Sequence, residues 1–267
     1  MLPYPDIDPV MIRLGPLEVR WYGMMYVFGF TATYLLVRHQ IRKFALDPLA
    51  VHFENLNFVL LLGIILGARL GYVFFYNPSY YLSHPLGILS TWEGGMSFHG
   101  GLIGLILAGF LYCRRHGLNF LRTADIYTVT APIGLACGRI GNFINGELFG
   151  RPAEVPWAMA FPAGGPLPRH PSQLYEGLLE GILLFVILWP LKDRKWPSGS
   201  MLAVFLCLYG MVRILAEFFR EPDPQLGFFF SFLTMGQLLS SIMIISGATI
   251  LILNRGKKNL TTQVDRL

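Results

Sequence analysis

Charged residues are scarce in this sequence. Asp, Glu, Lys and Arg make up 14% of its 267 residues, whereas soluble globular domains average about 25%. Hydrophobic residues account for 54% of the chain. This composition leaves little room for a separate soluble domain, and it predicts a polytopic membrane protein.

Cysteine is also scarce, and a cleavable leader is not expected. The three cysteines, Cys113, Cys137 and Cys207, all fall in apolar stretches, which excludes a disulfide framework and argues against a metal site. The first six residues, Met1 to Asp6, carry no basic n-region. We therefore expect the first apolar segment to be a retained helix rather than a signal peptide.

Seven apolar segments approach the length of about 20 residues that spans a bilayer as a helix. They are Trp21–Val37, Phe53–Phe75, Met96–Tyr112, Ala124–Ile144, Leu174–Leu191, Met201–Phe218 and Phe230–Leu253. We expect an all-α fold of about seven transmembrane helices in one domain, residues 1–267. Small residues at every fourth position, as at Gly63, Gly67 and Gly71, predict close helix packing. Pro132 is expected to kink the fourth helix.

Basic residues gather on one side of the expected bundle. They follow spans one, three, five and seven, at Arg38, Arg42, Lys43, Arg114, Arg115, Arg122, Lys192, Arg194, Lys195, Arg255, Lys257, Lys258 and Arg266. The other side holds only Arg13, Arg20, Arg151, Arg169 and Arg220. Because cytoplasmic loops carry the excess of Lys and Arg, we expect the N-terminus outside and the C-terminus in the cytoplasm.

The longest stretch outside the spans is Asn145–Pro171. It is rich in proline and contains the pair Gly164–Gly165, so turns dominate it. We expect residues 145–171 to form a small periplasmic head of short strands and loops, inserted between spans four and five.

The segment Gly138–Glu147 places an arginine and two asparagines directly after the apolar run Ile126–Cys137. An arginine at the bilayer centre costs roughly 2.5–3.5 kcal/mol on insertion scales, so Arg139 is expected to face a protein interior or a wet cavity. No acidic residue lies three or four positions from Arg139. We interpret it as a ligand for an anion, because a guanidinium offers phosphate several donors at once, with a structural ion pair as the alternative.

The expected topology brings further polar residues to the same outer face. They are Tyr22 and His99, which open spans one and three; Arg69, Asn142 and Arg213, near the ends of spans two, four and six; and Gln173, Tyr175 and Glu176, at the start of span five. In span six, Tyr209, Arg213, Glu217 and Arg220 share one helix face. Glu217 pairing with an arginine of its own helix is the structural alternative there.

His99 lies in a segment with glycines on both sides, Gly94-Gly95-Met96-Ser97-Phe98-His99-Gly100-Gly101. A hydrogen bond between helices is one interpretation, and a reactive role is the other. Histidine is the side chain that most readily exchanges a proton near neutral pH, and arginines beside it could hold a phosphate and stabilise its charge as it leaves. The residues therefore indicate an enzyme or carrier acting on an anionic lipid.

Five blocks in this order resemble the prolipoprotein diacylglyceryl transferase family. They are Arg20-Trp21-Tyr22-Gly23, Met96 to Gly101, Gly138 to Glu147 with Gly150, His170-Pro171-Ser172-Gln173-Leu174-Tyr175-Glu176, and Arg213 to Arg220. The blocks extend from residue 20 to about residue 220, nearly the whole chain.

The resemblance implies transfer of a diacylglyceryl group from phosphatidylglycerol to the lipobox cysteine of a prolipoprotein signal peptide, with release of glycerol-1-phosphate. It implies a bacterial inner-membrane enzyme surrounded by membrane lipid, acting in the periplasmic leaflet, without a metal, another cofactor or nucleic acid. The expected catalytic residues are His99, Arg139 and Arg213. The expected substrate-binding residues are Tyr22, Arg69, Asn142, Glu147, Gly150, Tyr209, Glu217 and Arg220. Whether His99 or a glutamate is the general base stays open.

Two rival functions remain. One is an anionic lipid transporter, but transporters place their sites near the midplane and often contain paired repeats with broken helices. No evident repeat is found in this sequence. The other is a non-catalytic assembly factor that binds anionic lipid, which predicts no turnover.

Overall fold

The computed structural model describes residues 2–15, 17–91, 94–221 and 233–264, without the side chains of residues 17 and 256–264. The expected start of the seventh span at Phe230 and the basic residue Arg266 lie outside the described residues, as do the side chains of Lys257 and Lys258. The chain forms two compact units. The larger unit comprises Met1–Val37 and Ala124–Leu267, and the smaller unit comprises Arg38–Thr123.

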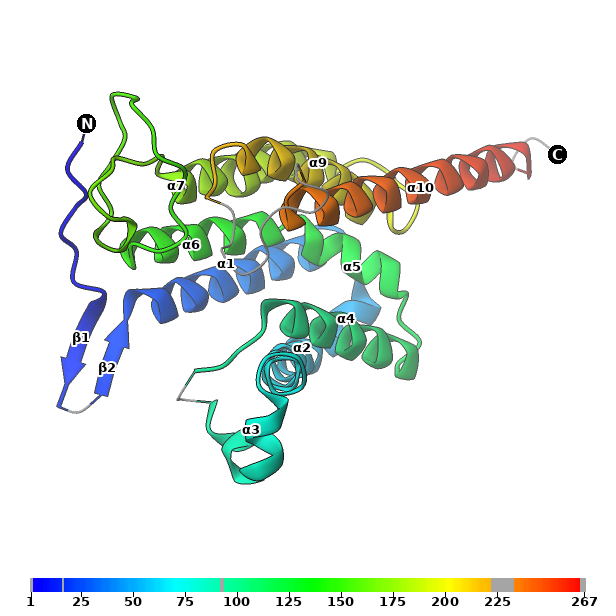
Figure 1. Ribbon diagram of the computed structural model, residues 1–267. Helices are drawn as coiled ribbons and strands as arrows, with labels where there is room; N and C mark the ends of the chain where they lie inside the picture. Colours follow the sequence, from blue (N-terminus) through cyan, green and yellow to red (C-terminus); the bar gives the residue numbers. More distant parts are fainter. Residues whose placement is uncertain (1, 16, 92–93, 222–232, 265–267) are drawn as a thin grey trace. The chain divides into compact units, whose positions relative to one another are not determined.

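Helices make up most of the larger unit (Figure 1). They are α1 (Trp21–Lys43) and α5 (Phe120–Thr128), which both cross the boundary between the units, α6 (Ala131–Ile144), α7 (Ser172–Glu176), the π-helix η4 (Gly177–Leu183), α8 (Leu184–Leu191), α9 (Ser200–Glu217) and α10 (Met235–Val264). A hairpin of β1 (Val10–Leu14) and β2 (Leu17–Arg20) precedes α1. Its strands are antiparallel, with Val10 opposite Arg20, and the span pattern did not predict it.

The smaller unit is built on α2 (Asp47–Phe75) and α4 (Phe98–Arg115), joined by α3 (Pro78–Ser83) and the 3₁₀-helix η1 (Pro85–Leu89). Glycines bring α2 and α4 together, as the spacing predicted. A Cβ added at Gly67 would lie 2.8 Å from the Cα of Gly104, and one added at Gly71 would lie 2.8 Å from the Cα of Gly100. Such close backbone approach stabilises helix pairs in lipid, where packing replaces the hydrophobic effect.

Four helical segments among the described residues are long and apolar enough to cross a membrane. They are Asp47–Phe75, Ser172–Leu191, Ser200–Glu217 and Met235–Arg255. The expected fourth span, Ala124–Ile144, is two shorter helices, since α5 ends at Thr128 and α6 begins at Ala131. Pro132 therefore lies in the first turn of α6, where its missing N–H costs nothing, and the kink expected within a continuous helix was wrong.

Residues 145–171 contain isolated bridges rather than strands, together with the short 3₁₀-helix η3 (Pro162–Gly164). Two side chains hold this segment. Phe161 is buried and packs against the rings of Tyr4 and Phe149. Arg169 donates hydrogen bonds to the carbonyl oxygens of Gly150 and Gly164, at 3.2 and 2.9 Å. The segment is thus ordered by an aromatic core and one arginine.

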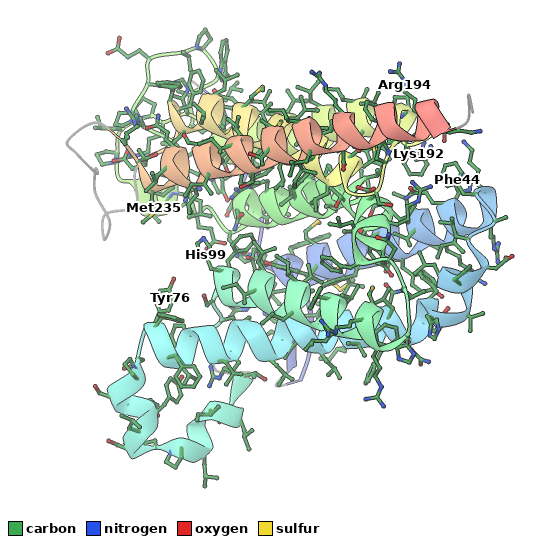
Figure 2. All side chains as sticks on the ribbon, turned by 90° about the vertical axis from the view of Figure 1, so that its right-hand side faces the viewer. Phe44, Tyr76, His99, Lys192, Arg194 and Met235 are labelled. Atoms are coloured by element: carbon green, nitrogen blue, oxygen red, sulfur yellow. The ribbon has the colours of Figure 1, made fainter. Side chains whose placement is uncertain are left out.

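Both units have basic residues at one end. In the larger unit, Lys192 and Arg194 lie at the end of α10 opposite Met235 (Figure 2). In the smaller unit, Phe44, which follows Arg42 and Lys43, lies at the end of α2 opposite Tyr76, and His99 lies at the same end as Tyr76 (Figure 2). Within each unit, the candidate site residues can therefore be placed relative to the basic end.

Candidate functional site

Six charged side chains meet inside the larger unit. They are Arg139 from α6, Glu176 from α7, Glu180 from η4, Arg213 and Glu217 from α9, and Arg220 just after α9. We call this group the arginine–glutamate cluster. Nη2 of Arg139 lies 2.7 Å from Oε2 of Glu176 and 3.3 Å from Oε2 of Glu180. The expected convergence of spans four, five and six is confirmed at these side chains.

Arg213 lies at the centre of the cluster. Its Nη1 donates to Oε2 of Glu176 at 2.8 Å and to Oε1 of Glu180 at 3.1 Å. Its Nη2 donates to Oε2 of Glu217 at 2.8 Å, the pair within one helix that the sequence allowed. Nη1 of Arg220 lies 3.8 Å from Oε2 of Glu176. Arg213 therefore joins α7, η4 and α9 through a single side chain.

The cluster is electrically balanced, with three positive and three negative side chains. The side chains of Glu176 and Glu180 are 0% exposed, whereas that of Arg139 is 17% exposed. Buried charges need such partners, because an unpaired ion in a low dielectric is costly. Oε1 of Glu176 is buried without a hydrogen-bond partner among the described residues. The arginines are thus the more accessible members of the cluster, and one carboxylate oxygen retains acceptor capacity.

A π-helix shapes the acidic side of the cluster. The segment η4 carries Glu180, and π-turns inserted into α-helices occur often at functional sites. Small residues allow its close approach to α6: a Cβ added at Gly181 would lie 2.5 Å from the Cβ of Ala136. A Cβ added at Gly177 would lie 3.5 Å from the Cβ of Arg139. Close packing of η4 on α6 therefore brings Glu180 within reach of Arg139.

Arg139 is paired in the structure, so its apparent lack of an acidic partner in the sequence was misleading. Both partners come from a later part of the chain. Glu180 was missed, although Glu176 and Glu180 are four residues apart in an apolar span and could have been matched to the arginines of spans four and six. Anion binding by Arg139 stays a prediction. Tyr209 also belongs here, since it interacts electrostatically with Glu180, Arg213 and Arg139.

A second group of predicted residues meets at the end of α6. Nδ2 of Asn142 donates to Oε1 of Glu147 at 2.9 Å, and Nδ2 of Asn145 donates to the same atom at 3.2 Å. The hydroxyl of Tyr22 hydrogen-bonds to Asn142 and lies 3.0 Å from the hydroxyl of Tyr26. The structure thus brings together Tyr22, Asn142 and Glu147, three of the predicted substrate-binding residues, and we call them the asparagine–glutamate group.

Gln173 connects the two groups. Its Nε2 donates to the carbonyl oxygen of Glu147 at 2.7 Å, and Glu176 follows it by one turn on α7. Gln173 is buried, and its Oε1 has no hydrogen-bond partner among the described residues. A buried amide oxygen and the buried Oε1 of Glu176 thus share one short helix, and both can still accept a hydrogen bond.

His170 belongs to a chain of hydrogen bonds. Nε1 of Trp157 donates to the hydroxyl of Tyr175 at 2.6 Å, and this hydroxyl lies 3.0 Å from Nδ1 of His170. Because the indole can only donate, the Tyr175 hydroxyl accepts from Trp157, and its own proton is available for Nδ1 of His170. Burial lowers the pKa of His170 below its ordinary value. The imidazole is therefore neutral at pH 7, although the sequence did not single it out.

Close packing explains why position 150 is a glycine. Its N–H donates to the carbonyl oxygen of His170 at 2.9 Å, and it pairs with Arg220 in an isolated bridge. A Cβ added at Gly150 would lie 2.7 Å from the Cβ of His170 and would also collide with the carbonyl oxygen of Phe219. Gly150 thus lets residues 145–171 approach the end of α9, and its predicted contact with substrate stays untested.

Arg69 and His99 belong to the smaller unit. Arg69 is buried, and its guanidinium donates to five main-chain carbonyl oxygens, those of Gly87, Ile88, Ser90, Gly94 and Gly95. His99 is exposed at the second residue of α4, beside the ring of Phe98. Because the two units are described separately, the expected meeting of His99 with Arg139 and Arg213 stays a prediction. Among the residues that the structure describes, no group of three or more His, Cys, Asp and Glu could hold a metal ion.

Comparisons with known proteins agree on one family. A family model described as prolipoprotein diacylglyceryl transferase matches residues 9–253. A protein of Desulfotalea psychrophila named phosphatidylglycerol–prolipoprotein diacylglyceryl transferase is 60% identical over 252 residues, which cover 92% of this chain and 93% of that protein. Proteins with the same name from Geobacter sulfurreducens and Bordetella avium are each 52% identical over 255 residues, covering 96% and 95% of this chain and 98% and 97% of those proteins.

Proposed function

Because the chain belongs to the prolipoprotein diacylglyceryl transferase family, we propose that it transfers the diacylglyceryl group of phosphatidylglycerol to the lipobox cysteine of a prolipoprotein. The thiol sulfur attacks the glycerol carbon that carries the phosphate ester. A C–S bond forms, the C–O bond breaks, and glycerol-1-phosphate leaves with the bonding electron pair. The thiol proton passes to a base. The two substrates balance the reaction between them, so it needs no oxidant or reductant.

The arginine–glutamate cluster is the observation that carries this proposal. A phosphodiester has one negative charge and its monoester product gains a second, so catalysis requires preorganised positive groups at the leaving phosphate. Arg139 and Arg213 supply planar guanidinium groups, held in place by Glu176 and Glu180. Their donors are oriented before substrate arrives, which avoids reorganisation during the reaction.

We assign proton removal to His99. A cysteine thiol has an ordinary pKa of about 8.5, so only a small fraction is thiolate at pH 7 and a base accelerates attack. His99 is exposed at the start of α4 and can receive such a proton. A glutamate remains the alternative base. The asparagine–glutamate group would orient the headgroup or peptide, since Glu147 is exposed and Asn142 fixes its carboxylate.

We further propose seven spans, with the site in the periplasmic leaflet of the bacterial inner membrane. Gly236, at the start of α10, packs against the carboxylate of Glu217, whereas Lys192 and Arg194 lie at the opposite end of α10 (Figure 2). The cluster is therefore far from the basic end. By the positive-inside rule, the basic end faces the cytoplasm.

A reconstitution experiment tests the proposed function. The chain, in vesicles of phosphatidylglycerol and phosphatidylcholine, is incubated with a lipobox peptide, and the product is analysed by mass spectrometry together with released glycerol phosphate. We expect a peptide thioether and an equal amount of glycerol phosphate. A peptide with serine in place of the lipobox cysteine is the control. Lipid translocation without thioether would support the transporter, and lipid binding without either would support the assembly factor.

A further inference from the structure

Every N–H group of the Arg69 guanidinium donates a hydrogen bond to a main-chain carbonyl oxygen. Nη2 donates to Gly87 and Ser90 at 2.6 and 3.1 Å, and Nη1 donates to Gly94 and Gly95 at 2.6 and 3.0 Å. Nε donates to Ile88 at 2.8 Å. A guanidinium has five N–H groups, and all five donate here, so Arg69 could donate to another ligand only by giving up one of these carbonyl oxygens.

The bound carbonyls belong to one stretch, residues 87–95, which leads to α4. Tyr81 covers the guanidinium from one side, with its ring centroid 5.2 Å away. A Cβ added at Gly95 would lie 2.7 Å from the ring of Tyr72 and 2.9 Å from Nη1 of Arg69, and the φ of Gly95 is +74°. A side chain at Gly95 would therefore be strained and would collide with both Tyr72 and Arg69.

The same turn of α2 also fixes the beginning of α4. The N–H of Ser97 donates to the carbonyl oxygen of Ala68, the residue before Arg69, at 2.9 Å. The hydroxyl of Ser97 accepts from the N–H of Gly100 at 3.2 Å and caps the helix. His99 follows Ser97 by two residues. The backbone leading to His99 is therefore tied to α2 at two successive points.

We propose that Arg69 is a positioning residue: it fixes the backbone at residues 87–90 and 94–95 and, through Gly94, Gly95 and Ser97, holds His99 where it removes the thiol proton. This inference rests on the proposed function. It replaces the expectation that Arg69 binds substrate, because binding a phosphate would take guanidinium donors away from these carbonyl oxygens. The fork geometry of arginine suits this role, since lysine has three donors at one point and cannot reach five separate carbonyls.

Steady-state kinetics of Arg69→Lys separate positioning from substrate binding. We expect kcat per folded enzyme to fall at least tenfold, with the KM for phosphatidylglycerol unchanged within twofold. Gly95→Ala should give the same pattern, and the double variant should be no worse than the more impaired single variant. Arg115→Lys, an exposed arginine in the last turn of α4, is the matched control and should keep wild-type kinetics. A tenfold rise in KM, or full activity in Arg69→Lys, would overturn the proposal.

Hydrogen exchange tests, independently of turnover, whether Arg69 holds the backbone that precedes α4. In Arg69→Lys, the amides of residues 87–90 and 94–95 should exchange at least tenfold faster, while those in the middle of α2 and α4 stay protected. Unchanged exchange at residues 87–90 and 94–95 would overturn the proposed role of Arg69 even if activity were lost. If the wild-type chain formed no thioether, the proposed function would fail while the exchange result still decided whether Arg69 holds this segment. If Arg69→Lys does not fold, Gly95→Ala answers both questions.

Discussion

Arg139 and Arg213 share one oxygen atom, Oε2 of Glu176, at 2.7 and 2.8 Å. The two arginines come from α6 and α9, so Glu176 bridges two positive groups on separate helices, and Glu180 contacts both as well. Like charges repel, and without Glu176 their approach would be unfavourable in a buried environment. The arrangement holds two guanidinium groups close together, which is what the proposed reaction requires.

Replacing Arg213 by lysine should impair chemistry while keeping the charge. Lysine cannot contact Glu176, Glu180 and Glu217 simultaneously, so we expect kcat to fall roughly 10²–10³-fold, as when one preorganised stabilising group is lost. Thioether formation measured under saturating phosphatidylglycerol checks this. Arg194→Lys, at the basic end of the larger unit, is the control and should retain full activity. A wild-type kcat in Arg213→Lys would contradict the role assigned to the guanidinium group of Arg213.

Removing Glu176 should destabilise the larger unit. Its side chain is 0% exposed and lies near three arginines, so Glu176→Ala leaves positive charge without its partner. Breaking a buried ion pair in this way costs about 3–5 kcal/mol. Glu176→Gln should cost less, because an amide still accepts one hydrogen bond. Denaturant unfolding in detergent micelles measures both, and equal stability of Glu176→Ala and wild type would refute the prediction.

A methyl group at Gly236 should disturb the cluster from outside. A Cβ added there would lie 2.8 Å from the carboxylate atoms of Glu217, so Gly236→Ala must displace this side chain from Arg213. We expect reduced kcat and little change in expression. At Gly134 an added Cβ meets nothing within 4 Å, so Gly134→Ala is the matched control. Equal activity of the two variants would show that the position of Glu217 is unimportant.

Stability should depend on pH through His170. Burial lowers its pKa in the folded state below the ordinary 6.5, so the unfolded chain binds more protons as the pH falls below 6.5. The thermal midpoint should therefore decrease from pH 7 to pH 5 and be insensitive to His170 above about pH 7. His170→Gln should flatten this decrease, whereas His84→Gln, at an exposed site, should not. A profile unchanged by His170→Gln would exclude this imidazole as the cause.

The sequence predicted those features that repeat or that stand out chemically. Helices occupy the expected apolar segments, and the glycines of α2 pack against α4, because periodic small and apolar residues leave a clear pattern. Arg139, Arg213 and Glu217 were conspicuous because charge is rare in such helices. Their positions in the expected topology were enough to bring them together.

What could not be predicted depends on contacts without a sequence signal. Carbonyl oxygens belong to every residue, so nothing in the sequence marks those of Gly87 or Gly94 as partners of Arg69. The pairing of Arg139 with Glu180 depends on the π-helix η4, whose extra residue per turn has no periodic pattern of its own. The break between α5 and α6 is likewise local, and the apolar run Ile126–Cys137 continues through it.

The equal numbers of positive and negative groups in the arginine–glutamate cluster bear on how product departs. An incoming phosphate has to compete with carboxylates for the same guanidinium hydrogens, so the headgroup is held less tightly than by unpaired arginines. When glycerol phosphate dissociates, Glu176 and Glu180 recapture those hydrogens at once. Under the proposed reaction, the carboxylates thus prevent the most charged species of the cycle from becoming an inhibitor.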